Sequence, residues 1–208
     1  NVVCSAIEHP AVHEACASLV AEGAEFREAP VDRDGIVDLA ALRDRVDDRT
    51  ALVAVMHANN EIGTIQPITA IGTWLKDAFP RARFHVDAVQ SFTKEPIDVH
   101  TARVDTLALS AHKLHGPKGT GALWVRRGVT LYPLLFGGSQ QHKVRPGTEN
   151  VAGIAGFAAA ARLAMATAEA DTARMRALRD RLIEGLCRTV PDTSLNGHPT
   201  NRLCNNAH

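Results

Sequence analysis

Short apolar runs alternate with helical repeats along most of the chain. Strands are predicted at residues 2–4, 25–29, 51–56, 83–86 and 104–109. Helices are predicted between them, from about 10 to 22, from the capping residue Asp38 to about 46, and from 68 to 78. This order predicts an α/β fold in which a mostly parallel sheet is flanked by helices on both faces.

The last part of the chain departs from this alternation. Residues 121–125 predict an antiparallel or edge strand. The Ala-rich stretch from about 150 to 187 predicts two helices with a break near 167–171, the second carrying an apolar stripe of Met175, Leu178, Leu182 and Leu186. The chain begins as a strand without an initiator methionine, and residues 202–204 are typical of the approach to another strand. We therefore expect both ends to lie inside a longer protein.

Composition narrows the class of protein. A chain of 208 residues with 45% hydrophobic and 22% charged residues is ordinary for a globular protein. Its net charge of zero, without a long basic run, argues against a nucleic-acid partner. No apolar run approaches the roughly 20 residues of a membrane span and no signal peptide is visible, so we expect a cytoplasmic protein with no membrane partner. The four cysteines are widely spaced and form no CxxC pair, which predicts buried thiols and neither a disulfide framework nor a metal site.

Polar residues gather just past the predicted strands, where ligands bind in open parallel sheets. Four clusters have this position: Glu8-His9, Asn59-Asn60-Glu61, Asp87 with Gln90, and Ser110 with His112-Lys113. Convergence at one edge would bring residues from distant parts of the sequence into a single site.

Each cluster also has a structural interpretation. His9 precedes Pro10 and suits the start of a helix, Asn59 and Asn60 suit a turn, and Lys113 taken alone suits the surface. Asp87 is harder to explain in this way, because an acid directly after a buried strand is costly unless it is paired.

Taken together, the clusters contain what a phosphate-bearing pyridine cofactor requires. Lys113 supplies an amine for a covalent bond to an aldehyde, and Asp87 supplies a carboxylate that keeps the ring nitrogen protonated. His9 supplies a flat group to stack on the ring, and Ser110 and His112 supply donors for the phosphate. This combination indicates pyridoxal 5'-phosphate.

Five motifs in this order resemble the cysteine desulfurases of the class V aminotransferase family, over nearly all of the chain. They are the segments 8–12 (EHPAV), 56–63 (MHANNEIG), 85–90 (HVDAVQ), 110–119 (SAHKLHGPKG) and 145–150 (RPGTEN). The resemblance implies the large domain of a fold type I enzyme over residues 1–165 and the start of a small C-terminal domain over residues 166–208.

The resemblance also implies roles for individual residues. Lys113 resembles the lysine that bonds to the cofactor and moves the substrate proton, and Asp87 resembles the partner of the pyridine nitrogen. Gln90 matches the partner of the phenolic oxygen, His9 the stacking residue that assists proton transfer, and Asn60 the asparagine near the cofactor and substrate.

The phosphate ligands implied by the resemblance come from two subunits. Ser110 and His112 match ligands within one subunit, and Thr148 matches the threonine that reaches the phosphate of the neighbouring subunit. A homodimer with shared sites is therefore implied.

The implied reaction converts L-cysteine to L-alanine and leaves the sulfur on an enzyme cysteine as a persulfide, for a sulfur-acceptor or scaffold protein in iron-sulfur cluster or other sulfur-compound synthesis. None of Cys4, Cys16, Cys187 and Cys204 matches the family's nucleophilic cysteine, and the arginine for the substrate carboxylate is also missing from the matched region. We therefore expect this stretch alone to be inactive in sulfur transfer. A selenocysteine lyase, another class V enzyme and a non-catalytic binding module on the same fold remain alternatives.

Overall fold

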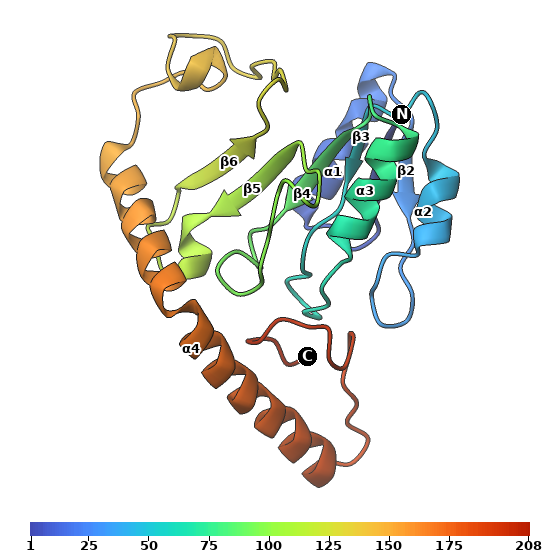
Figure 1. Ribbon diagram of the computed structural model, residues 1–208, viewed down its shortest axis with the longest axis vertical. Coiled ribbons are helices and arrows are strands. Elements are labelled where there is room, and N and C mark those ends of the chain that lie inside the picture. Colours follow the sequence, from blue (N-terminus) through green and yellow to red (C-terminus); the bar gives the residue numbers. More distant parts are fainter.

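The computed structural model describes residues 1–208 and contains one six-stranded sheet (Figure 1). Its spatial order is β2-β1-β3-β4-β5-β6. The strands are β1 (Val2–Ser5), β2 (Phe26–Ala29), β3 (Leu52–Ala54), β4 (Arg83–Asp87), β5 (Thr106–Ser110) and β6 (Gly121–Val125). Neighbouring strands from β2 to β5 pair in parallel, and β6 pairs antiparallel with β5 at the edge. The predicted α/β class and the antiparallel edge strand are confirmed.

The helices begin where the sequence provides start signals. They are α1 (Pro10–Ser18), continued by a 3₁₀ turn η1 (Leu19–Glu22), α2 (Leu39–Arg45), α3 (Ile68–Ala78) and α4 (Val151–Thr189); short 3₁₀ turns η2 (Ala111–Leu114) and η3 (Gln141–Lys143) complete the set. The side chain of Asp38 accepts hydrogen bonds from the backbone N–H groups of Ala40 and Ala41 at 2.9 and 3.0 Å, so it caps α2 as predicted. α3 has the predicted bounds.

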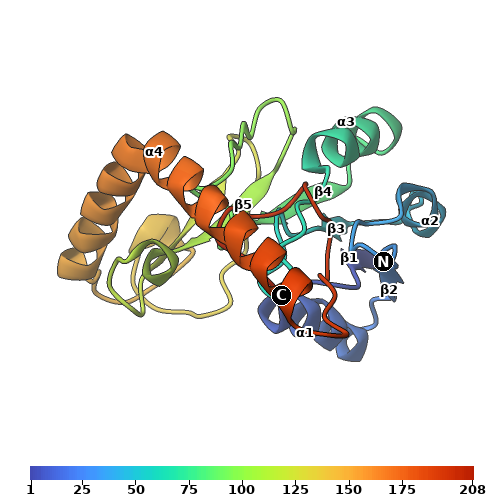
Figure 2. The same ribbon diagram turned by 90° about the horizontal axis from the view of Figure 1, so that it is seen from below.

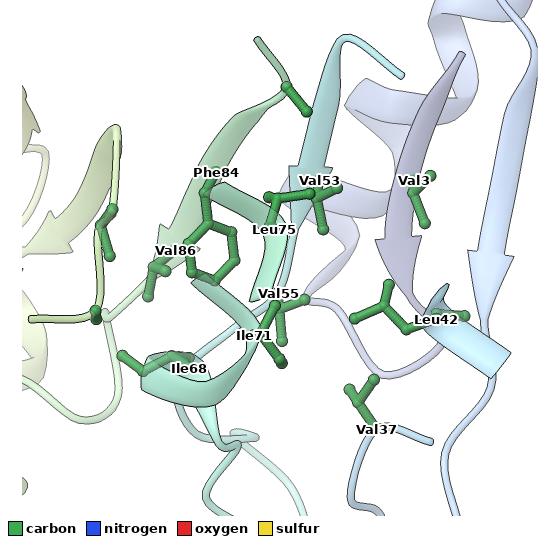
Figure 3. Close-up of a cluster of buried hydrophobic side chains, with 14 of the residues drawn as sticks. Val3, Val37, Leu42, Val53, Val55, Ile68, Ile71, Leu75, Phe84 and Val86 are labelled. Carbon is green, nitrogen blue, oxygen red and sulfur yellow. The ribbon is translucent and has the colours of Figure 1, made fainter. Parts of the chain in front are cut away.

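Alternating side chains of the strands pack against helices on the two faces of the sheet. Figure 2 shows α2 and α3 on one side of the sheet and α1 on the other. On the first side, the strands contribute Val3, Val53 and Phe84 to the cluster drawn in Figure 3, where they meet Leu42 of α2 and Leu75 of α3. Each such side chain stabilises the fold by about 1.5–3 kcal/mol when fully buried. This core holds β1, β3, β4 and β5 in fixed register, and their carboxyl ends with them.

The second side of the sheet has a smaller core. Val2 and Cys4 of β1 and Ala54 of β3 pack there against Cys16 of α1. Cys4, Cys16 and Cys204 are buried as predicted, but Cys187 is exposed, because it lies near the end of α4 where no other segment covers the helix.

The C-terminal part of the chain contains three differences from the prediction. α4 is a single helix of 39 residues, so the predicted break near 167–171 is wrong. Residues 165–175 contain neither Gly nor Pro, and the hydroxyl groups of Thr167 and Thr172 bond to the carbonyls of Leu163 and Ala168 within the helix. The predicted domain division at 165/166 falls inside this continuous helix and stays a prediction. Residues 202–204 form no strand, since Arg202 makes only an isolated antiparallel bridge with Thr64.

α4 also corrects the expectation about long apolar runs. By length and composition alone, it is apolar enough to cross a membrane. However, Phe157 of α4 packs against Ala111 and Leu114 of η2. One such helix is weak evidence for a membrane segment, and its contact with η2 gives it a role within the fold.

Candidate active site

The sheet brings the four predicted clusters to one edge. β1, β3, β4 and β5 are neighbours and run in the same direction, so the segments that follow them lie side by side below the sheet in Figure 1. Direct hydrogen bonds join these segments. Asn59 Nδ2 donates to the carbonyl of Ile7 at 2.9 Å, and His57 N donates to the carbonyl of Asp87 at 2.8 Å. These bonds connect the first three clusters, and the parallel pairing of β4 with β5 places the cluster of Ser110, His112 and Lys113 next to them.

Asp87 ends β4 with its carboxylate only partly used. The residue is 9% exposed. Its Oδ1 accepts a hydrogen bond from Val89 N at 2.8 Å, while no protein donor bonds to Oδ2 and no cation pairs with the group. A buried carboxylate with one free oxygen is suited to accept a hydrogen bond from a ligand N–H.

Lys113 lies in η2, the turn that directly follows the neighbouring strand β5. Ala111 and Leu114 anchor this turn in a buried cluster, so His112 and Lys113 face outward and are exposed. The Lys113 amine makes no hydrogen bond or ion pair with the protein. Asp87 pairs with Ala108 in the β4–β5 register, and Ser110 follows two residues later. An unengaged amine and an unsatisfied carboxylate thus lie at the same edge.

Ser110 and His112 form a polar pair next to the amine. The hydroxyl oxygen of Ser110 is 2.7 Å from His112 Nδ1. The turn that holds them closes through His115, which has a left-handed φ of 65°, and through Gly116, where an added Cβ would lie 3.0 Å from the Ala111 side chain. The backbone therefore fixes this pair close to Lys113.

His9, Asn59 and Asn60 between them have structural roles at this edge and also leave polar atoms free for a ligand. His9 Nδ1 accepts a hydrogen bond from Ala11 N at 3.1 Å and so caps α1, which leaves Nε2 free. Asn59 makes the turn, since its Oδ1 accepts from Glu61 N and Ile62 N at 2.9 and 3.0 Å. Asn60, half-buried beside it, makes no side-chain hydrogen bond and is free to bind a ligand.

Gln90 lies in the turn after β4 with its side-chain amide unbonded and half-buried. Lys94 Nζ donates to the carbonyl of Gln90 at 3.0 Å and steadies this turn. Lys94 and Lys113 both line a cavity of about 660 Å³ that extends between η2 and α4. Burial lowers the pKa of Lys94.

Glu8 belongs to the predicted Glu8-His9 cluster, but no role for it was predicted from the sequence. It is 8% exposed, its Oε1 accepts hydrogen bonds from Ser5 Oγ and, at 2.6 Å, from Met56 N, and its Oε2 has no partner. Burial, followed by the charge of Asp87, raises the pKa of Glu8 to about 7. Its position just past β1, three residues after Ser5, was the signal in the sequence.

Thr148 is not brought to this edge within one chain. It is exposed in the segment between β6 and α4, and it makes no side-chain hydrogen bond to the other candidates. Because β6 is antiparallel, this segment leaves the sheet at the opposite end from β4 and β5 (Figure 1).

The residues present at this edge fit a pyridoxal 5'-phosphate group. The free Oδ2 of Asp87 suits a protonated ring nitrogen, the unengaged Lys113 amine suits an aldehyde, and the Ser110–His112 pair suits a phosphate. No cluster of three or more potential metal ligands is present.

Comparison with known proteins agrees with this chemistry. A family model described as aminotransferase class-V matches residues 1–207. The chain belongs to this family. It is 50% identical to a cysteine desulfurase IscS from Methanosarcina thermophila over 208 residues, or 100% of this chain and 51% of that protein. It is 46% identical to cysteine desulfurase 2 from Trichormus variabilis over 205 residues, or 99% of this chain and 51% of that protein. The chain therefore spans about half the length of the curated relatives it matches.

Solved structures of similar proteins share the fold. DndA from Streptomyces lividans superposes with a TM-score of 0.90 at 35% identity, covering 98% of this chain and 57% of DndA. A NifS-like protein gives a TM-score of 0.87 at 41% identity, covering 90% of this chain and 51% of that protein. SspA, solved in complex with cysteine, gives 0.72 at 37% identity, covering 77% of this chain and 46% of SspA. These similarities establish a fold type I class V architecture.

Proposed function

We propose that the chain supplies the cofactor-binding part of a pyridoxal-phosphate-dependent cysteine desulfurase, which converts L-cysteine to L-alanine and transfers the sulfur to an enzyme cysteine as a persulfide. The observation that carries the proposal is the presence of an unengaged Lys113 amine and the free Oδ2 of Asp87 at the same edge of the sheet. The cysteine desulfurase names of the relatives, and the cysteine bound to SspA, support L-cysteine as the substrate.

Each residue has a task that follows from its free atoms. Asp87 Oδ2 would accept the ring N–H, and Lys113 Nζ would hold the aldehyde and later take the substrate α-proton. Bound pyridoxal phosphate supplies an electron sink for the electrons released at the substrate α-carbon. His9 would cover the ring and use Nε2 for proton transfer, because Nδ1 is occupied by Ala11 N.

The remaining candidate residues would bind and orient the cofactor and the substrate. Gln90 and Asn60, whose side-chain amides are unbonded, would donate to the oxygen substituents of the ring and to the substrate. Ser110 and His112 would bind the phosphate, with the hydroxyl and the imidazole already 2.7 Å apart.

We also propose that the working form is a homodimer in which Thr148 completes the phosphate site of the partner subunit. An exposed apolar surface supports a second copy as the occupant. Tyr132, Leu134 and Phe136 of the β6–α4 segment are 85%, 94% and 89% exposed, and Val151 at the start of α4 is 72% exposed. The cytoplasmic location and the sulfur-acceptor partner expected from the sequence stay predictions.

Sulfur transfer requires an accessible thiolate near the substrate, and none of the four cysteines of this chain is well placed to supply it. Cys4, Cys16 and Cys204 are buried, and Cys187 lies near the far end of α4. We therefore propose that the 208 residues alone accumulate no persulfide when cysteine and cofactor are added. Thiol-specific persulfide labelling tests this, and strong labelling of any of the four cysteines would contradict it.

Absorbance spectroscopy tests the proposed cofactor chemistry. Adding pyridoxal phosphate to the wild-type protein should produce a band at roughly 400 nm, the region of the lysine-bound cofactor. Lys113→Ala should abolish the band, whereas Lys118→Ala, a change at an exposed lysine five residues later, should retain it. A wild-type protein without the band would instead favour a non-catalytic binding module. In an enzyme that also contains the nucleophilic cysteine, release of alanine from cysteine, rather than activity on selenocysteine alone, would distinguish a desulfurase from a selenocysteine lyase.

A further inference from the structure

Arg202 is a large, completely buried side chain that has no carboxylate partner. It is 0% exposed. Its Nη1 donates to the carbonyls of Asn196 and His198 at 3.1 and 3.4 Å, and its Nη2 donates to the carbonyl of Ile62 at 3.1 Å and to Asn206 Oδ1 at 2.8 Å. A guanidinium removed from water and held by neutral oxygens destabilises the fold unless those oxygens stay in place. Arg202 therefore fixes the groups around it, including the Ile62 carbonyl.

The same C-terminal segment, residues 196–206, fastens the loop 59–66 at several further points. The bonds run from Leu203 N to Gly63 O at 2.9 Å, from His198 N to Thr64 Oγ1 at 2.9 Å, from Ile65 N to Asn201 O at 3.1 Å, and from Asn206 Nδ2 to Glu61 O at 2.6 Å. The approach is close, since a Cβ added to Gly63 would lie 2.6 Å from the Asn206 side chain. The segment (red in Figure 1) lies directly beneath the carboxyl edge of the sheet.

The same loop carries Asn59 and Asn60 of the candidate active site. Asn59 bonds to the carbonyl of Ile7 and to the backbone N–H groups of Glu61 and Ile62. Asn60 lies between these fixed points, and its own side chain bonds to nothing in the protein. The position of the Asn60 amide is therefore set by the loop backbone, which Arg202 and its neighbours hold from below.

The C-terminal segment is fastened in turn to α4. Arg179 of α4 is 7% exposed and donates to the carbonyls of Arg202 and Leu203 at 3.2 and 2.8 Å. The same helix packs through Phe157 against the η2 turn that carries Lys113. Hydrogen bonds and packing thus connect the loop that carries Asn60 with the η2 turn that carries Lys113, by way of the C-terminal segment and α4.

We propose that Arg202 is a positioning residue that holds the loop 59–66 so that Asn60 meets the cofactor and substrate. The proposal rests on the proposed function for the role of Asn60 and extends it to a residue about 140 positions away in the sequence. A merely structural Arg202 would affect stability but would show no dependence on Asn60.

Hydrogen exchange of the cofactor-free protein tests whether Arg202 holds the loop. In Arg202→Lys, a single amine replaces the forked guanidinium, and exchange in peptides covering 59–66 should accelerate by at least about tenfold, while peptides of β4 remain unchanged. Asn206→Ala removes one Arg202 acceptor and also the bond from Asn206 Nδ2 to the Glu61 carbonyl, so it should do the same if the lysine variant folds poorly. The matched control is Arg188→Lys at an arginine of α4 whose side chain is 73% exposed. Unchanged exchange in both Arg202→Lys and Asn206→Ala would overturn the proposal.

A double-mutant cycle tests whether the held loop serves Asn60. Arg202→Lys and Asn60→Ala should each weaken pyridoxal phosphate binding by about tenfold, measured by the band near 400 nm, and the double variant should bind no more weakly than Asn60→Ala. Independent, multiplied losses would overturn the positioning role. A wild-type protein without the band would contradict the proposed function instead, and the exchange experiment would still decide whether Arg202 holds the loop.

Discussion

Two buried aspartates at opposite ends of the sheet have contrasting surroundings. Asp105, just before β5 at the amino end, is 0% exposed and accepts hydrogen bonds from Lys76 Nζ, from Arg126 Nη2 and, at 2.8 Å, from Phe84 N. Burial alone would raise the pKa of Asp105, but the hydrogen bonds and charge of Lys76 outweigh it and lower the pKa. The negative charge of Asp105 is therefore balanced by cations of the fold itself.

Asp87, at the carboxyl end of β4, is nearly as buried but receives a single hydrogen bond, from Val89 N. The nearby acid Glu8 adds a second carboxyl group without adding a cation. The comparison shows that the amino end of the sheet uses its buried acid for stability, whereas the carboxyl end leaves its acid available for a ligand.

The largest expected effect comes from exchanging these aspartates for asparagine. Asp105→Asn leaves Lys76 buried without its counter-charge, and should reduce the free energy of unfolding by about 3–5 kcal/mol. Asp87→Asn should change it by less than about 1 kcal/mol, because only one hydrogen bond is at risk, yet it should weaken the cofactor band. Urea denaturation measures the free energy of unfolding of both variants, with the exposed Asp44→Asn as a control, and absorbance measures the cofactor band. Equal losses for Asp87 and Asp105 would remove the distinction between the two ends.

The next largest effect is a pH dependence at the carboxyl end. Since the pKa of Glu8 is about 7 in the folded protein, above its ordinary value of 4.5, its ionisation reduces stability as the pH rises from 4.5 to 7. The full loss above pH 7 corresponds to about 3 kcal/mol. Glu8→Gln can keep the bonds from Ser5 and Met56 and cannot ionise, so its free energy of unfolding should rise relative to wild type across this window and level off above it.

A second buried group changes stability in the opposite direction. Burial lowers the pKa of His57 to about 4, so that stability is lost as the pH falls from 6.5 toward 4. This contribution is common to wild type and Glu8→Gln and cancels in their difference. Denaturation curves at several pH values provide the measurement, with the exposed Glu14→Gln as the control. Parallel curves for wild type and Glu8→Gln would show that Glu8 is ionised in the folded protein.

A smaller effect is expected from the Ser110 hydroxyl. Ser110→Ala should leave the free energy of unfolding within about 0.5 kcal/mol of wild type, since the hydroxyl bonds only to the exposed His112. It should weaken cofactor binding by about tenfold, the value of one hydrogen bond to a charged phosphate. Spectral titration with pyridoxal phosphate measures the change, and the exposed Ser194→Ala serves as the control. A binding constant equal to that of wild type would exclude Ser110 from the phosphate site.

Local signals in the sequence predicted much of the first 125 residues. The apolar spacing of Ile68, Ile71 and Leu75 gave α3 its bounds, because a helix with one buried face repeats at this spacing. Asp38 marked the start of α2 through a bond to its own neighbours. The edge position of Asp87 followed from strand order alone, since acids rarely follow buried strands without a partner.

Features that depend on distant contacts were not predictable in this way. α4 reads as two helices because its polar middle suggests a break, but its alanines and charged residues favour a continuous helix. The contact between Arg202 and Ile62 joins residues about 140 positions apart, and no local pattern announces it. Glu8 was recognised as part of a polar cluster, but its burial was not predicted, because it depends on Ser5 and the distant Met56.

Identifying the residue that bonds covalently to the cofactor tests the central claim most directly. The protein would be loaded with pyridoxal phosphate, reduced with borohydride to fix the adduct, digested and analysed by peptide mass spectrometry. The account predicts a single modified residue, Lys113, with labelling strongly reduced in Asp87→Asn. Modification of Lys94 or Lys118 with Lys113 unlabelled, or no modified peptide at all, would contradict it.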